Sequence, residues 1–188
     1  VGTVTEIYDF MRLLFARAGE AYSYLSGQKM IRQSEDQILD ALLGNFAGKK
    51  LTLLAPVVKG RKGHYRELFV QIRKQGFTKV RIDGKLEEIT AKMQVDRFKI
   101  HDIEIVVDRI VADPQDRFRI SQSVARAMKE GKGVMMAMEE SGKVHHFSRF
   151  LMDPATGLSY DEPAPNLFSF NSPYGACPVC NGLGVIEE

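Results

Sequence analysis

The stretch IHDIEIVVDRIV, residues 100–111, decides the fold of this chain. Its apolar side chains recur at every second position through Ile103, Ile105 and Val107, which is the period of a β-strand with one buried face. It is the strongest strand pattern in the sequence, and it predicts a sheet built around it. Two further stretches, KKLTLLAPVV at 49–58 and FTKVRID at 77–83, predict neighbouring strands.

Turn and cap signals divide this region into hairpins and helices. Asp83-Gly84 and Ser141-Gly142 are typical hairpin turns, and Ser34 followed by Gln37 is a capping box that opens a helix. Helical spacing of apolar residues predicts three more helices: one at 4–18, one whose apolar stripe runs from 65 to 72 and which stops at Gly76, and one at 114–128. The resulting expectation is an α+β fold of mixed α/β type, a compact domain of sheet and helices.

The two ends of the chain differ in character from this domain. Five of the seven prolines lie between 154 and 178, in a stretch with no hydrophobic period. Inserted domains enter at exposed loops whose ends lie close together. We therefore predict a domain at 30–149 that is inserted into a partial, largely irregular and helical segment made of 1–29 and 150–188.

The composition is that of an ordinary folded protein without strong charge bias. The 188 residues carry a net charge of +2 and two cysteines, which argues against a disulfide framework and favours a reducing, cytoplasmic location. The apolar runs are too short to cross a membrane, so no membrane partner is expected. Any contact with nucleic acid must come from a local basic patch.

Two groups of basic residues are candidate binding sites. Lys59, Arg61 and Lys62 lie in KGRKG, an expected loop before a helix, where they form either an anion or phosphate site or a solvated turn. In FTKVRID the period of two places Lys79 and Arg81 on one face and Val80 on the core face. Two cations on an exposed sheet surface form either a solvated face or a docking site for an acidic partner.

Arg109 is a harder case within the strongest strand. It shares parity with Ile103, Ile105 and Val107, which would turn it toward the core. An exposed role requires a bulge or the strand end to re-aim its side chain.

Cys177 and Cys180 form a C-P-V-C step that supplies half of a tetrahedral zinc site. A redox pair is disfavoured because NGLG is a poor helix start. No other cysteine exists, and His145 and His146 would face opposite ways in a strand. A metal-free pair of thiols in a folded knuckle is therefore favoured over a zinc site.

No catalytic constellation is visible in the sequence. GNFAGKK at 44–50 resembles a phosphate-binding loop, but it is one residue short, lacks Ser or Thr after its lysines and precedes a strand. We therefore expect no enzymatic activity from this chain, and the only cofactor that its residues leave open is zinc at the incomplete site of Cys177 and Cys180.

Five stretches, in order, carry a resemblance to a known family: VGTVTEIYDFMRLLFARAG, LAPVVKGRKGHYRELF, KQGFTKVRIDG, HDIEIVVDRIV and LFSFNSPYGACPVCNGLG. Across nearly all 188 residues the chain resembles the UvrA family, the damage-sensing subunits of the bacterial UvrABC excinuclease. The resemblance implies part of the first signature domain interrupted by the inserted UvrB-binding domain. In the full-length parent it implies an ATP- and Mg-dependent ABC-type ATPase dimer that searches DNA and hands lesions to UvrB in nucleotide excision repair.

The resemblance also implies roles for single residues. Lys79 and Arg109 match basic positions with which the family binds UvrB, and Arg81 joins them by strand parity. Asp153 and Thr156 stand where the family usually has two zinc-binding cysteines, and Ser23 and Ser26 replace another pair found in some relatives. Docking of UvrB is thus the expected function. The alternative is a DNA-contact module that binds phosphates through the 59–62 loop and the cysteine flank.

Overall fold

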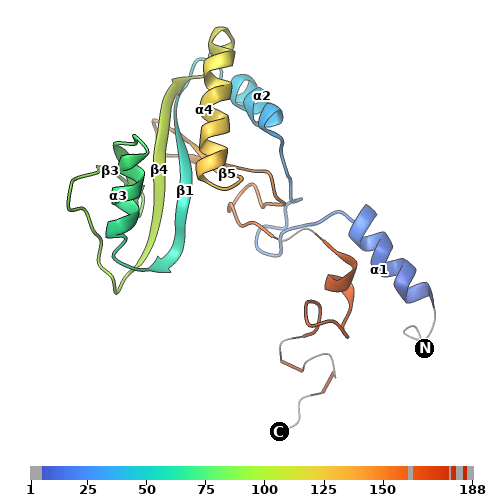
Figure 1. Ribbon diagram of the computed structural model, residues 1–188. Helices are drawn as coiled ribbons and strands as arrows, with labels where there is room; N and C mark the ends of the chain where they lie inside the picture. The colour runs from blue at the N-terminus through green and yellow to red at the C-terminus, as the bar shows by residue number, and fades with distance from the viewer. Residues whose placement is uncertain (1–5, 161–162, 178, 181–183, 186–188) are drawn as a thin grey trace. The chain divides into compact units, whose positions relative to one another are not determined.

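The computed structural model describes residues 6–160, 163–177, 179–180 and 184–185, which divide into two compact units (Figure 1). One unit contains residues 31–159, and the other combines the two ends of the chain. None of the helices in the described part of the chain has the length and apolar composition that a membrane span requires. The elements are α1 (Glu6–Ala18), α2 (Glu35–Asn45), β1 (Lys50–Lys62), α3 (Arg66–Lys74), β2 (Lys79–Ile82), β3 (Lys85–Glu88), β4 (Ile100–Val111), the 3-10 turn η1 (Pro114–Asp116), α4 (Arg117–Glu130), β5 (Val134–Glu139), β6 (Val144–Ser148) and the 3-10 turn η2 (Pro165–Phe168).

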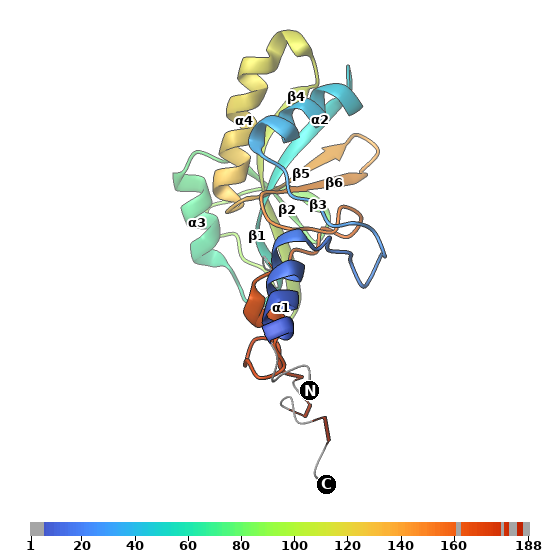
Figure 2. The same cartoon turned by 90° about the vertical axis from the view of Figure 1, so that its right-hand side faces the viewer.

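A six-stranded sheet with the order β3-β2-β4-β1-β5-β6 forms the larger unit, and its strand pairs are antiparallel. This confirms the α+β prediction, and the stretch 100–111 is β4 itself, at the centre. Both hairpins are confirmed, including β5–β6, which Figure 2 shows clearly. At the first turn Asp83 and Gly84 have φ of 49° and 88°, the left-handed pair that a tight hairpin requires.

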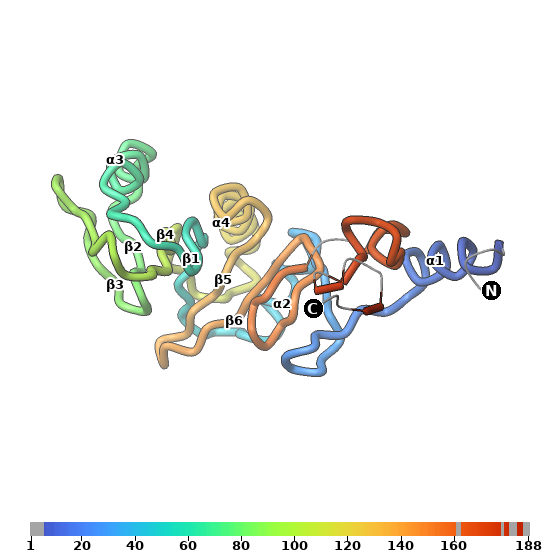
Figure 3. Tube along the Cα trace, turned by 90° about the horizontal axis from the view of Figure 1, so that it is seen from below, coloured from blue at the N-terminus to red at the C-terminus, as the bar shows by residue number. Residues whose placement is uncertain are grey.

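Helices α3 and α4 lie on the same side of the sheet (Figure 3), and they bury two apolar clusters against it. The first cluster joins α2 and α4 to β1, β4, β5 and β6, with Leu42 and Leu53 fully buried. The second lies under α3 and joins Phe69 to Val80 and Ile105. The predicted capping box of α2 is present, with the Ser34 and Gln37 side chains each accepting a backbone N–H of the other.

The larger unit reaches Ser159, ten residues beyond the expected end at 149. The added segment is tied to the unit by two isolated bridges, which pair Met152 with Ile31 and with Ser159. Segment 153–159 therefore returns onto the sheet domain instead of leaving it, and this return shapes the candidate site.

The smaller unit is held together by aromatic contacts along α1. The Tyr8 hydroxyl donates a hydrogen bond to the Phe168 carbonyl at 2.9 Å, and its ring lies 5.9 Å from that of Phe170. Phe15 packs on Phe168 in the same way, at 6.0 Å between centroids. The helix predicted at 4–18 is present from Glu6 on, and its first two residues lie outside the described part of the chain.

Candidate functional site

The sheet has a second face, opposite α3 and α4, which we call the outer face. Cross-strand partners project to the same side of a sheet, so the register identifies its members. Leu54 pairs with Val106 and Met136, Pro56 with Glu104, and Thr52 with Arg109 and Met138. The outer face comprises Thr52, Leu54, Pro56, Lys79, Arg81, Glu104, Val106, Arg109, Met136, Met138, Val144 and His146.

Arg109 reaches the outer face through a β-bulge. Leu53 pairs with Asp108 and Leu54 with Val106, so Val107 is one extra residue in β4. The bulge reverses the parity of the residues that follow. Asp108 accordingly turns toward α4, where its carboxylate accepts hydrogen bonds from Ser123 at 2.6 Å and Arg119 at 3.1 Å. Arg109 is exposed on the opposite side, as its predicted role requires.

The three predicted docking cations therefore share one sheet face, but they differ in their surroundings. Lys79 forms an ion pair with Glu88 at 3.3 Å, and its side chain is 38% exposed. Arg81 is more buried, and it faces Glu104 on β4 at 3.4 Å. Arg109 makes no ion pair with any residue that the structure describes.

A cavity of about 970 Å³ lies over the second half of β1. It is bounded by outer-face residues, by the return segment 156–159 and by residues next to α3 and α4, namely Val57, Tyr65, Leu68, Gly131 and Lys132. Lys59 and Arg61 both line it, whereas Lys62 does not. The expectation of a loop at KGRKG is wrong, because β1 continues to Lys62 and pairs Arg61 with His101. Gly60 takes up the irregularity with φ of 63°, and its N–H donates to the Asp102 carboxylate at 2.7 Å.

The cavity also contains two functional groups that the sequence did not single out, Glu104 and Lys132. His146, which the sequence analysis considered only as a metal ligand, lines it together with Arg81. Glu104 shares its strand parity with Asp102, but only the strand order shows that it faces Arg81 across β2 and β4. Lys132 follows α4, and nothing in the sequence pattern links it to β1. The Lys59 ammonium group donates to the Gly157 carbonyl at 3.3 Å, which ties the return segment to the cavity wall.

Three buried polar atoms in the cavity wall have no hydrogen-bond partner: Arg81 Nε, Glu104 Oε2 and His146 Nδ1. Burial raises the pKa of Glu104 to about 7, although the positive charge of Arg81 opposes the shift. Burial also lowers the pKa of His146, and the nearby Lys59 charge adds to this effect. Unpaired buried polar atoms are costly, so these three groups lower the stability of the fold around the cavity.

The raised pKa of Glu104 makes the stability of the fold dependent on pH. Between its ordinary pKa of 4.5 and about 7, the folded chain keeps a proton that the unfolded chain has lost. Unfolding then releases a proton, so the contribution of Glu104 to the free energy of unfolding falls as pH rises through this range. We expect the stability difference between wild type and Glu104→Gln to change over pH 4.5–7 in urea titrations. A constant difference would contradict the buried, proton-binding state of Glu104.

Gly157 closes the cavity in a conformation that only glycine adopts without strain. Its φ is +69°, and a Cβ there would lie 2.4 Å from Cδ2 of His146. We expect Gly157→Ala to lower the free energy of unfolding by roughly 1–3 kcal/mol. Gly142→Ala is the matched control, since Gly142 has φ of +86° with open space around it. Equal losses in the two variants, measured by urea denaturation, would show that the His146 contact costs nothing.

The predicted metal residues do not form a metal site in the described part of the chain, where no three metal-ligating side chains gather. Cys177 is exposed and Cys180 half-buried, and the amides of Cys180 and Val179 hold the pKa of the Cys177 thiol below its usual value. Asp153 and Thr156, which stand at the family's cysteine positions, accept hydrogen bonds from backbone N–H groups of the same turn. Asp153 accepts from the Ala155 N–H at 2.9 Å, and Thr156 from the N–H two residues on at 3.3 Å.

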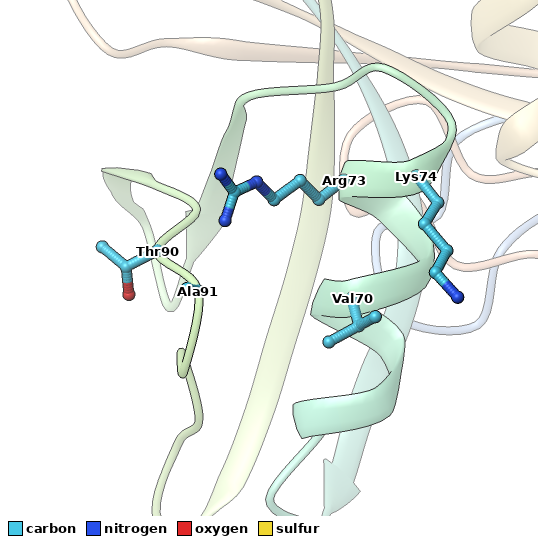
Figure 4. Close-up of a pocket in the computed structure, with 5 residues that line it drawn as sticks. All are labelled: Val70, Arg73, Lys74, Thr90 and Ala91. Carbon is cyan, nitrogen blue, oxygen red and sulfur yellow. The ribbon is translucent and has the colours of Figure 1, made fainter.

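A smaller hollow of about 270 Å³ lies between α3 and the segment after β3 (Figure 4). Arg73 reaches toward Thr90 and Ala91, whereas Lys74 points away from them. No carboxylate, histidine or cysteine lines it, so it offers neither acid–base chemistry nor the mixed charge of the cavity over β1.

Comparison with known proteins gives one consistent result. The model of the family described as "UvrA interaction domain" matches residues 33–141. The chain is 43% identical to UvrABC system protein A of Thermus thermophilus and of Bacillus subtilis, and 42% identical to that of Deinococcus radiodurans. Each match covers the whole chain but only 19–20% of the relative. The chain thus spans about a fifth of the length of the curated relatives it matches.

Proposed function

The chain belongs to the UvrA family, and from this premise we propose that its sheet domain docks UvrB through the outer face. The observation that supports the proposal is the bulge at Val107, which brings Arg109 to the same face as Lys79 and Arg81. Cations gathered on one surface steer an acidic partner into register.

The apolar residues of the outer face fit the same proposal. Val106, Met138 and Val144 are half-buried, and they lie in the rows that link the cationic strands β2 and β4 to β5 and β6. A docking interface combines an apolar centre with a charged rim. The outer face offers both, and the face that α3 and α4 cover does not.

For the longer protein of which this chain resembles one part, we propose the role that the family implies. It is an ATP-dependent, dimeric sensor of DNA damage in the cytoplasm that delivers lesions to UvrB for nucleotide excision repair. The present region contributes the contact with UvrB and does not itself hydrolyse ATP.

Calorimetric titration of the 188-residue chain with purified UvrB tests the proposal. We expect saturable binding that weakens moderately with salt, since only a few charges carry it. A parallel titration uses a short DNA duplex, for which binding should be weak and steeply dependent on salt. A folded chain that binds the duplex and not UvrB would contradict the docking proposal and support the DNA-contact function.

A further inference from the structure

We propose that His101 is a pH-sensitive clamp that holds segment 90–99 against the sheet domain while its ring is doubly protonated and releases the segment on losing one proton. We call this segment the strap. It follows β3 and leads into β4, and Thr90 and Ala91 at its start face α3 across the small hollow of Figure 4. The clamp is independent of UvrB docking, because none of its groups is one of the docking cations.

His101 lies between two groups that only accept hydrogen bonds. It is 5% exposed. Its Nδ1 atom lies 2.7 Å from an oxygen of the Asp83 carboxylate, and its Nε2 atom lies 2.8 Å from the carbonyl oxygen of Asp96. A neutral imidazole carries one N–H donor, and only the imidazolium carries two. Because a buried polar atom without a partner is costly, the two contacts together require the imidazolium.

The direct partners of His101 favour its charged form. The hydrogen bond with Asp83 raises the pKa of His101, the Asp96 carbonyl adds to this effect, and burial opposes it. Although burial opposes it there too, hydrogen bonds from the Asp102 N–H and from His101 lower the pKa of the Asp83 carboxyl, which keeps Asp83 ionised. The imidazolium therefore has a negative partner in direct contact.

The other charged groups near the ring come from each neighbouring element and are exposed to water, which screens them. They are Arg61, Lys62 and His64 at the end of β1 and after it, Lys85 beyond the hairpin turn, Asp96 and Lys99 in the strap, and Asp102 on β4. Arg61 is the strand partner of His101 and opposes its charge. Within the strap, the Asp96 carboxylate and Lys99 pair with each other at 3.9 Å.

Few bonds fasten the middle of the strap. In the described part of the chain there are two: the contact of His101 with the Asp96 carbonyl, and the Val95 N–H, which donates to the His64 carbonyl at 3.1 Å. Met93 and Val95 also pack against the apolar cluster under α3. A segment held by so few bonds can open locally without unfolding of the sheet, so the loss of one bond matters.

Loss of one proton from His101 breaks the strap contact and keeps the contact with the hairpin turn. The remaining proton stays on Nδ1, because a hydrogen bond to the Asp83 carboxylate is stronger than one to a carbonyl. Nε2 then presents a lone pair to the Asp96 carbonyl oxygen, and two acceptors repel each other. The strap separates from β4 and uncovers Met93 and Val95.

The sign of the pH dependence follows from the raised pKa of His101. The stabilisation by the clamp is fully present below the ordinary value of 6.5, and it is lost as pH rises through the pKa of the folded chain. The strap is therefore closed at low pH and open at high pH.

Nitrogen NMR of the 188-residue chain labelled at histidine tests the protonation state. The ring-nitrogen shifts show which atoms carry protons, and His101→Gln identifies the signals of His101 by their absence. We expect a titration midpoint above 6.5, with Nε2 as the atom that loses its proton. A midpoint at or below 6.5, or loss of the Nδ1 proton instead, would overturn the proposal.

Backbone amide signals in the same titration test the release. As pH rises through the His101 midpoint, the amides of Met93 and Val95 should shift and gain fast motion in nitrogen relaxation measurements. The amide of Ala112, which bonds to the Lys49 carbonyl beyond the other end of β4, should stay unchanged. A His101 that titrates while the strap amides keep their shifts and their rigidity would contradict the clamp.

Asp83→Asn should keep the strap closed at high pH as well. The asparagine carbonyl still accepts the Asp102 N–H, and its amide N–H faces Nδ1 of His101. A neutral ring then accepts at Nδ1 and donates from Nε2 to Asp96, so both contacts are satisfied without the second proton. Asparagine also tolerates the φ of 49° at this position.

Asp102→Asn is the matched control for this variant. It removes an equal charge beside His101, but the Asp102 carboxylate bonds to the Gly60 N–H and not to the ring. We expect the control to release its strap at high pH as wild type does, with thermal unfolding used to verify that both variants are folded. If Asp83→Asn releases the strap in the same way as Asp102→Asn, the proposal is wrong.

Discussion

Replacing Lys79 and Arg109 together by glutamate is expected to weaken binding of UvrB at least about a hundredfold, or about 2.8 kcal/mol. Both side chains lie on the outer face, and neither supports the core, because Lys79 pairs only with the exposed Glu88 and Arg109 is exposed. Reversal replaces attraction to an acidic partner by repulsion, which costs more than simple removal of a charge. Titration calorimetry measures the loss.

The control for this variant changes the same net charge on the other side of the sheet. Arg73→Glu with Lys74→Glu places two carboxylates on exposed positions of α3, which covers the opposite face. This pair should bind UvrB with nearly wild-type affinity. If both double variants lose affinity equally, the attraction is a property of overall charge, and the outer face has no special role.

Phe69→Ala is expected to lower the free energy of unfolding by about 3–5 kcal/mol, through lost burial and a residual cavity. Phe69 is 1% exposed at the centre of the cluster under α3, where it packs with Val80 and Ile82 of β2. This loss is a large part of the 5–15 kcal/mol that stabilises a typical domain. Because β2 carries Lys79 and Arg81, the same variant should also weaken docking.

Urea denaturation followed by circular dichroism measures this effect, and Phe118→Ala is the matched control. Phe118 lies on α4 with 77% of its surface exposed, so its truncation should change stability by less than about 0.5 kcal/mol. A small loss for Phe69→Ala would contradict the view that α3 and the β2–β4 region form one cooperative core.

The sequence predicts the outer face where alternation is regular and fails where it is interrupted. FTKVRID alternates without a break, so Val80 is buried and Arg81 faces outward, as expected. In β4 the extra residue Val107 reverses the parity of Arg109. The sequence shows that an exposed Arg109 requires a bulge or a strand end. It does not show whether a bulge forms, because that depends on the residues that pair with β4 on the neighbouring strand.

The cavity is less predictable from the sequence, for two physical reasons. KGRKG contains the glycines of a typical loop, yet long-range pairing with β4 extends the strand through it. Lys132, His146 and Gly157 reach the same cavity from three other segments, because the strand order places β1 between β4 and β5. Local patterns carry no information on that order.

Methyl NMR of the chain labelled at methionine tests the central claim most directly, since methionines lie on both sides of the sheet. Met136 and Met138 belong to the outer face, and Met138 lies in one row with Thr52 and Arg109. Met128 and Met135 are buried in the cluster beneath α2 and α4. On addition of UvrB, we predict shifts for Met136 and Met138 and little change for Met128 and Met135. Shifts confined to the second pair, with the first unchanged, would contradict docking on the outer face.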